Sequence, residues 1–177
     1  MLEIIQNHLP SYCYSKNNYK SIDGAVIHFI SAVNVSPDDP FNLHNILDIF
    51  KQYKVSANYL VRRQGGVIEL VPPKRKAYHA GKSIMNGREG CNEFTIGIEL
   101  EGGTDFPYTD EQILVTGQLL AQSMTENHYT SDWVQGHDRV RANWNDTYPN
   151  MKKSKKVDPG DHFPWEILND MIKGIGQ

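Results

Sequence analysis

Two spacings of hydrophobic and polar residues recur along this chain, and each predicts a different kind of element. Residues 24–30 read GAVIHFI, an apolar and β-branched run that predicts a central strand covered on both faces. In residues 95–101, isoleucine and leucine occupy one side, and threonine, glycine and two glutamates occupy the other. This alternation predicts a second strand. Residues 57–63 and 66–70 flank a Gln-Gly pair and predict a β-hairpin.

Apolar residues at helical spacing predict three helices. The first follows the proline-rich residues 37–40, and the second begins behind Thr109 and Gln112, which match a capping box. The third begins at Pro164 and ends at Gly174. The expected buried positions are Ile46, Leu47, Phe50 and Tyr53 in the first helix, Ile113, Leu114, Gly117, Leu120, Ala121 and Met124 in the second, and Ile167, Leu168, Met171 and Ile172 in the third.

Residues 143–154 are polar and show no period, so they predict a loop. Strands and helices alternate along the rest of the chain, which is typical of an α/β protein with a mixed central sheet flanked by helices. With 177 residues the chain is long enough for one substantial core. We therefore expect a single domain over residues 1–177.

Composition narrows the classes of function. Hydrophobic residues make up 39% of the chain and charged residues 22%, as in ordinary globular proteins, and the net charge of −3 argues against nucleic-acid binding. The sequence shows neither an export signal nor a run of about 18 apolar residues that could span a membrane. We expect a cytoplasmic protein that would reach any extracytoplasmic substrate only by another route. Cys13 and Cys91 form neither a CxxC pair nor a disulfide framework.

Two histidines are candidate metal ligands. Hydrolytic zinc sites take three ligands from His, Asp, Glu and Cys and leave a fourth position for water. His28 lies in the middle of an apolar strand and needs a hydrogen bond or a metal, because an unpaired buried imidazole costs about 1–3 kcal/mol. His137 follows Gly136 at the end of a short extended run, where ligands are common. The alternative interpretations are a hydrogen-bonded core histidine and a loop histidine.

The run KKSKKVDPGDHF, residues 152–163, places four lysines before one aspartate. A lysine run of this kind is usually a solvated loop. Pro159 favours extended geometry at Asp158, and in an extended chain Lys156 and Asp158 point to the same side. An ammonium group would then lie beside a carboxylate ligand. The alternative is a surface ion pair that contributes little to stability.

Glu99 lies on the polar side of residues 95–101, and Gly97 before it leaves room for another group to approach. If this side is covered, burial raises the pKa of Glu99, which suits a general base. Glu101, two residues further on, favours the alternative of a solvated face.

Seven segments occur in a characteristic order within residues 22–165. They are AVIHF, VSANYLVRRQGGVIELVP, AYHAGKS, GREGCNEFTIGIELEG, YTDEQ, GHDRV and KKVDPG. Together they resemble the zinc-dependent N-acetylmuramoyl-L-alanine amidases of the amidase-2 family. The resemblance is nearest to the AmpD branch, which acts on anhydro-muropeptides, and extends to phage-type endolysin amidases.

The resemblance implies a mixed sheet flanked by helices and hydrolysis of the amide between the lactyl group of N-acetylmuramic acid and L-alanine, in peptidoglycan or in muropeptides. It implies a zinc ion, Zn2+, held by His28, His137 and Asp158. It implies that Glu99 is the catalytic acid or base and that Lys156 stabilises the oxyanion. The substrate-binding residues that it implies are Lys54, Asn58, His79, Ala80 and Gly81, with a plain loop histidine as the alternative for His79.

Departures from the AmpD branch bear on the substrate. That branch carries an asparagine at the position of Phe29 and an arginine at the position of Lys54. The segment between the predicted strand at residues 24–30 and VSAN is also shorter than in that branch. This shortening and the basic loop at residues 152–156 favour an enzyme that cuts intact wall. A cytosolic recycling amidase for anhydro-muropeptides is the alternative. A non-catalytic peptidoglycan-binding module is disfavoured, because all three candidate ligands and Glu99 are present.

Overall fold

Six strands form the central sheet of the computed structural model, which describes residues 2–151 and 153–175. Their order is β1-β5-β4-β9-β3-β10, and all neighbours are parallel except β4 and β5. The strands are β1 (Ile4–Gln6), β3 (Gly24–Ile30), β4 (Tyr59–Val61), β5 (Val67–Glu69), β9 (Thr95–Glu101) and β10 (Val134–Gly136). This arrangement confirms the α/β class and the mixed sheet.

Two small antiparallel pairs lie outside the main sheet. They join β2 (Tyr14–Asn18) to β6 (Arg75–Ala77), and β7 (Ile84–Met85) to β8 (Arg88–Glu89). Short 3-10 turns occur at Ser11–Cys13, Cys91–Glu93 and Ser131–Trp133. Both cysteines are buried free thiols, as expected.

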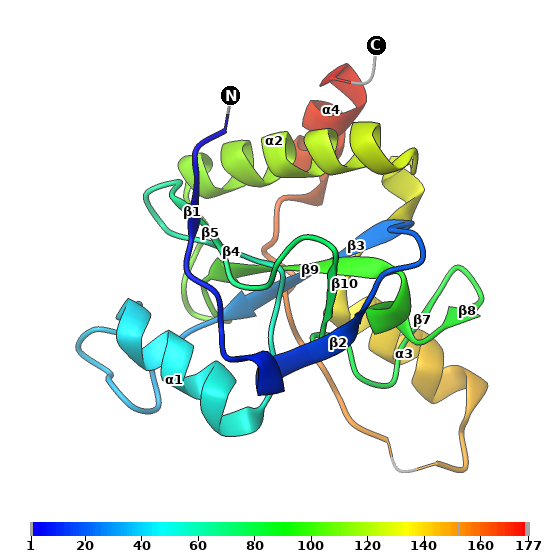
Figure 1. Cartoon of the computed structure of the whole chain (residues 1–177), viewed down its shortest axis with the longest axis horizontal. Helices are drawn as coiled ribbons and strands as arrows, with labels where there is room; N and C mark the ends of the chain where they lie inside the picture. The colour runs from blue at the N-terminus through cyan, green and yellow to red at the C-terminus, as the bar shows by residue number, and fades with distance from the viewer. Residues whose placement is uncertain (1, 152, 176–177) are drawn as a thin grey trace.

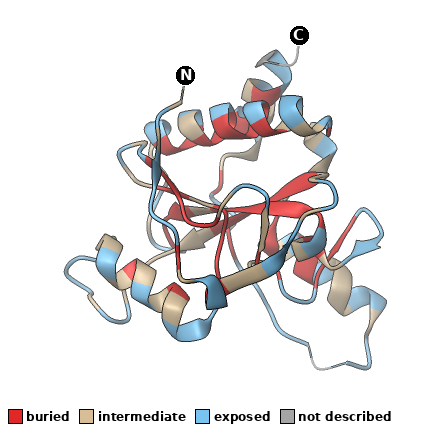
Figure 2. Ribbon diagram, viewed as in Figure 1, coloured by how far each residue is buried: buried red, intermediate tan, exposed pale blue. Residues whose placement is uncertain are grey.

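The helices cover the two faces of the sheet. They are α1 (Leu43–Tyr53), α2 (Asp110–Asn127), α3 (His137–Thr147) and α4 (Trp165–Ile175). Figure 1 shows α2 and α4 together on one face, with α1 and α3 on the other. The described buried residues are concentrated in the central strands and on the side of α2 that faces them (Figure 2). Two helical layers therefore enclose the sheet and exclude water from both of its faces.

Strands β3 and β9 form the centre of the sheet and confirm the two strand predictions. They pair in parallel over their whole length, with His28 opposite Glu99. The polar side of β9 is also covered, because the Glu101 side chain is fully buried and pairs with Arg62 Nε and the backbone N–H of Arg63. The inference from Glu101 that this side is solvated is therefore wrong.

The hairpin and the capping box are confirmed. Strands β4 and β5 pair antiparallel around Gly65, whose φ of +79° requires the left-handed region that glycine adopts without strain. At the start of α2, the Thr109 side chain accepts a hydrogen bond from the Gln112 backbone, and the Gln112 side chain accepts one from the Thr109 backbone. Both signals are local, which explains why they could be read from the sequence.

Residues 143–154 are not wholly a loop, because α3 extends to Thr147. Only one aliphatic residue of this helix is buried, Val140, and it packs against Val26 of β3. The helix therefore has almost no apolar side for a period to reveal. Three predicted buried positions are also wrong: Tyr53, Leu114 and Ile167 are exposed.

Truncation of Leu120, which is 0% exposed in the core between α2 and the sheet, should lower the free energy of unfolding. We expect Leu120→Ala to cost about 2–5 kcal/mol, because the substitution leaves a cavity. Leu114→Ala is the matched control on the same helix, since Leu114 is 49% exposed and its truncation should change stability by less than about 0.5 kcal/mol. Urea denaturation measures both, and equal losses would contradict this packing.

Candidate metal centre and active site

Three side chains from distant parts of the chain meet at one point. His28 Nδ1 lies 3.0 Å from His137 Nδ1 and 3.0 Å from Asp158 Oδ2, and His137 Nδ1 lies 2.9 Å from the same oxygen. Donor atoms bound to a tetrahedral zinc at ordinary ligand distances are about 3.3 Å apart. Two imidazole nitrogens and one carboxylate oxygen with this spacing form a group that could hold a divalent metal ion.

Sheet register brings the two histidines together. Strand β10 runs parallel to β3 and ends with Gly136 opposite Ile27. The next residue on each strand is then a histidine, so His137 at the first position of α3 lies beside His28. The prediction that His137 ends a short extended run is confirmed, but the residues that follow it form a helix instead of a loop.

A second set of contacts positions Asp158. Its backbone carbonyl accepts a hydrogen bond from the Asp138 N–H at 2.8 Å, which satisfies one of the unpaired donors in the first turn of α3. Tyr108 Oη donates to the carbonyl of Pro159 at 2.7 Å. A Cβ atom at Gly136 would lie 2.7 Å from Pro159 Cδ and 2.3 Å from Asp138 Oδ1. The absence of a side chain at Gly136 therefore lets the Asp158 segment approach α3.

Glu99 lies on β9, the strand that pairs with β3, and completes the polar centre. Opposite residues on paired strands point to the same face, so Glu99 lies on the side of the sheet that carries His28. Its Oε2 is buried and has no hydrogen-bond partner among the described residues. Burial raises the pKa of Glu99 well above its usual value, the charge of Asp158 raises it further, and Lys156 opposes the shift.

The pKa values of two of the expected ligands, His28 and Asp158, shift in the opposite direction. Burial lowers the pKa of His28 to about 4, and the neighbouring His137 adds to the shift. Burial also disfavours the charged form of Asp158, but the imidazoles of His137 and His28 beside its Oδ2 outweigh that effect and hold its pKa well below the usual range. Neutral imidazoles and an ionised carboxylate are the forms that bind metals.

A cavity of about 240 Å³ opens beside this centre. His137 and Lys156 line it, together with the loop residues His79, Ala80 and Gly81. The cleft therefore contains one of the three expected metal ligands, the expected oxyanion lysine and three of the five expected substrate-binding residues.

The two remaining substrate-binding predictions fare differently. Lys54 is exposed at the C-terminal end of α1, next to Val55 of the cavity lining. Asn58 is 0% exposed, and its side chain accepts hydrogen bonds from the Gly97 N–H and from Tyr19 Oη. A side chain without exposed surface cannot contact a substrate, so the expectation for Asn58 is replaced by a structural role in holding β9.

Comparison with known proteins identifies the relationship. Residues 18–161 match the N-acetylmuramoyl-L-alanine amidase family, amidase-2. The chain belongs to this family. The 1,6-anhydro-N-acetylmuramyl-L-alanine amidase AmpD of Enterobacter cloacae is 35% identical over 148 residues, which span 81% of this chain and 71% of that protein.

Solved structures agree with the family assignment. A crystal structure of a selenomethionine derivative of AmpD matches with a TM-score of 0.71 and 27% identity, over 97% of this chain and 95% of that one. The amidase AmiD of E. coli, solved with the substrate anhydro-N-acetylmuramic acid-L-Ala-D-gamma-Glu-L-Lys, matches with a TM-score of 0.67 and 25% identity, over 89% of this chain and 60% of that one. The resemblance found in the sequence is confirmed.

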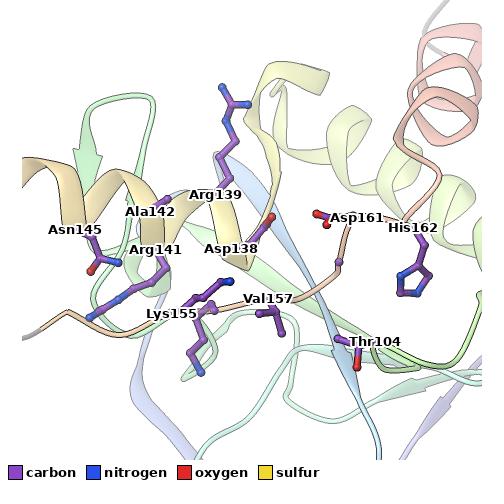
Figure 3. A pocket seen from close by; sticks show the side chains of 12 residues that line it. Thr104, Asp138, Arg139, Arg141, Ala142, Asn145, Lys155, Val157, Asp161 and His162 are labelled. Carbon is purple, nitrogen blue, oxygen red and sulfur yellow. The ribbon is translucent and has the colours of Figure 1, made fainter.

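A larger hollow of this amidase, about 610 Å³, is lined by residues of α3 and of the segment around Lys155 and Val157 (Figure 3). Asp138 and Arg139 of α3 line it with Lys155, and Lys156 lines both this hollow and the cleft beside the metal centre. Lys153, Lys155 and Lys156 are exposed, as expected for a solvated basic loop, and Lys152 lies outside the described residues. Within the described residues, no helix is both long enough and apolar enough to cross a membrane.

Sequence reasoning missed a residue that supports this amidase cleft. Arg141 donates from Nη1 to the carbonyl of Lys82 at 3.0 Å and from Nε to the carbonyl of Ser154 at 3.3 Å. It thereby ties the loop after Gly81 to the segment that leads to Lys156. Arginine in a polar stretch gives no periodic signal, and only its position directly after the GHDRV segment could have drawn attention to it.

Addition of a side chain at Gly136 should disturb the metal centre. We expect Gly136→Ala to lower the free energy of unfolding by about 1–3 kcal/mol and to weaken binding of a divalent metal, because the new methyl group displaces the Asp158 segment. Gly174→Ala is the control, since no atom lies within 4 Å of its Cβ position and alanine is the better helix former. Urea denaturation and metal titration test both variants, and unaltered metal affinity in Gly136→Ala would contradict this account.

Proposed function

We propose that this chain is a zinc-dependent N-acetylmuramoyl-L-alanine amidase, with His28, His137 and Asp158 as the metal ligands. The observation that carries the proposal is the convergence of three donor atoms at about 3.0 Å from one another, with Glu99 on the neighbouring strand. Membership of the amidase-2 family supplies the reaction, which is hydrolysis of the amide between the lactyl group of N-acetylmuramic acid and L-alanine.

The donor set fits zinc, which is commonly bound by imidazole nitrogen and carboxylate oxygen in hydrolytic sites with three protein ligands. When bound there, zinc supplies Lewis-acid chemistry, polarising the scissile carbonyl and making water a better nucleophile at neutral pH.

Glu99 is the group that moves the proton. Its buried carboxylate accepts a proton from the attacking water and returns it to the nitrogen of L-alanine as the amide bond breaks. The unpaired Oε2 is available for this role because no described side chain satisfies it. The raised pKa makes the protonated carboxyl accessible, as its second step requires.

Lys156 stabilises the developing negative charge on the carbonyl oxygen. Its ammonium group is exposed at the rim of the cleft and lies close enough to influence the pKa of Glu99 and of His28. Donors to an oxyanion in comparable sites contribute about 3–4 kcal/mol each. His79, Ala80 and Gly81 of the opposite wall bound the space for the sugar and the first residue of the stem peptide.

The substrate that we propose is a soluble muropeptide with a 1,6-anhydro sugar. The name of the AmpD relative specifies this sugar, and AmiD was solved with an anhydro-muropeptide. The basic segment that ends at Lys156 instead supports intact peptidoglycan, an anionic polymer in many walls, as a second candidate. A non-catalytic binding module is the third candidate, and the complete donor set argues against it.

Incubation of the zinc-loaded protein with soluble anhydro-muropeptide, and separately with intact sacculi, followed by mass analysis, separates these candidates. We expect the soluble substrate to release a peptide with L-alanine at its amino end. Glu99→Gln should lose about 10²–10⁴-fold in turnover while it retains zinc, because the metal ligands are untouched. Glu111→Gln is the matched control, on an exposed position of α2. Zinc-loaded protein that cleaves neither substrate would support the binding module.

The pH dependence should reveal the coupling between Glu99 and Lys156. Activity requires the ionised carboxylate, so kcat/KM should fall as the pH decreases through the pKa of Glu99, which burial raises above the ordinary value of about 4.3. Removal of the positive charge in Lys156→Met raises this pKa further, and the acid limb of the residual activity should move to higher pH. Lys155→Met, the control from the other hollow, should leave the limb in place. An unchanged limb in Lys156→Met would contradict the assignment.

A further inference from the structure

His79 lies against His28 on the side opposite to the metal centre. Its Nδ1 is 3.1 Å from His28 Nε2, and its own Nε2 is 3.1 Å from the carbonyl oxygen of Thr95. The two rings are nearly perpendicular, with centroids 5.3 Å apart. A continuous path of hydrogen bonds therefore leads from the backbone of β9 through two imidazoles to the ligand atom His28 Nδ1.

The direction of these hydrogen bonds follows from the acceptor at their end. A carbonyl oxygen can only accept, so the hydrogen of His79 must be on Nε2. A neutral imidazole with hydrogen on Nε2 has its lone pair on Nδ1, and His28 Nε2 must then be the donor in the contact between the rings. The lone pair of His28 is consequently on Nδ1, the atom that faces His137 and Asp158, and in the absence of metal the donor to Asp158 Oδ2 is then His137 Nδ1.

The surroundings of His79 favour its neutral form and fix its position. Among the described residues, the polar contacts of its ring are one imidazole and the oxygens of Thr95, and they include no carboxylate. Its backbone N–H and that of Ala80 both donate to Asn92 Oδ1, at 3.1 and 2.8 Å. A Cβ atom at Gly97 would lie 2.5 Å from His79 Cγ. The ring therefore occupies a space on β9 that exists only because residue 97 has no side chain.

We propose that His79 is a positioning residue that holds His28 as the Nε2–H tautomer, so that its Nδ1 lone pair is directed at the metal. This role, which rests on the proposed metal site, differs from the substrate contact implied by the family resemblance. A histidine ligand whose second ring nitrogen donates to a fixed acceptor is oriented and made more basic, and loss of such an acceptor typically lowers metal affinity about 10–100-fold. In most such pairs the acceptor is a carboxylate, a carbonyl or water. Here an imidazole, itself set by the carbonyl of Thr95, takes that place.

A matched pair of variants isolates the acceptor. In His79→Asn the side-chain oxygen replaces the acceptor near the position of Nδ1, whereas His79→Leu has nearly the same shape and no acceptor. We expect His79→Leu to lose about 10–100-fold in zinc affinity, measured by competition with a chromophoric chelator, and His79→Asn to recover most of that loss. Equal affinity of the two variants would overturn the proposal.

A spectroscopic measurement tests the same inference without metal. Long-range proton–nitrogen correlation spectra of the metal-free wild-type protein report which nitrogen of His28 carries hydrogen, and we expect Nε2. Hydrogen on Nδ1 would overturn the proposal. Because this measurement uses the wild-type protein, it remains decisive even when His79→Leu does not fold. Wild-type protein that binds no zinc would refute the proposed function, and the tautomer of His28 would still decide the role of His79.

Discussion

Burial of a carboxylate and two imidazoles at one point is the constraint on which the rest of the structure depends. Groups of this kind are costly to remove from water unless their polar atoms are paired or bind a metal. The fold meets this requirement toward the carboxyl ends of parallel strands, where His28 of β3 and His137 after β10 lie side by side and Asp158 approaches from a later segment. Ligand sites of open α/β sheets are commonly found at that edge.

Two groups can approach the strands at this edge only because the strand residues next to them are glycines. Gly136 admits the Asp158–Pro159 segment to the start of α3, and Gly97 admits the ring of His79 to the surface of β9. Neither glycine has a φ angle in the left-handed region, so an ordinary residue could adopt either backbone conformation. What each glycine contributes is the space that a side chain would fill. The geometry of the three donor atoms thus depends on two positions without a Cβ atom, one on each of the strands that flank β3.

The same environment gives two carboxylates opposite properties. Asp158 lies beside two imidazoles and remains ionised, the form that the proposed ligand role requires. Glu99 has no partner for one buried oxygen, so burial raises its pKa and makes proton transfer possible. A pair of acids whose pKa values are pushed apart in this way can divide binding from acid–base work. Lys156 is exposed at the rim of the cleft, and its positive charge opposes the rise in the pKa of Glu99.

Local signals in the sequence determined the central strands, the hairpin and the capped helix α2, because alternation, turn residues and caps act over a few neighbouring residues. The segment motifs indicated the family and, through it, the expected metal ligands. Periodicity alone did not decide whether His28 and Glu99 belong to the core or to a functional site. Only the tertiary structure shows what surrounds them, since His28 meets partners 109 and 130 residues away. The helix α3, the buried role of Asn58 and the position of His79 against a metal ligand depended likewise on contacts between distant segments, which no local pattern encodes.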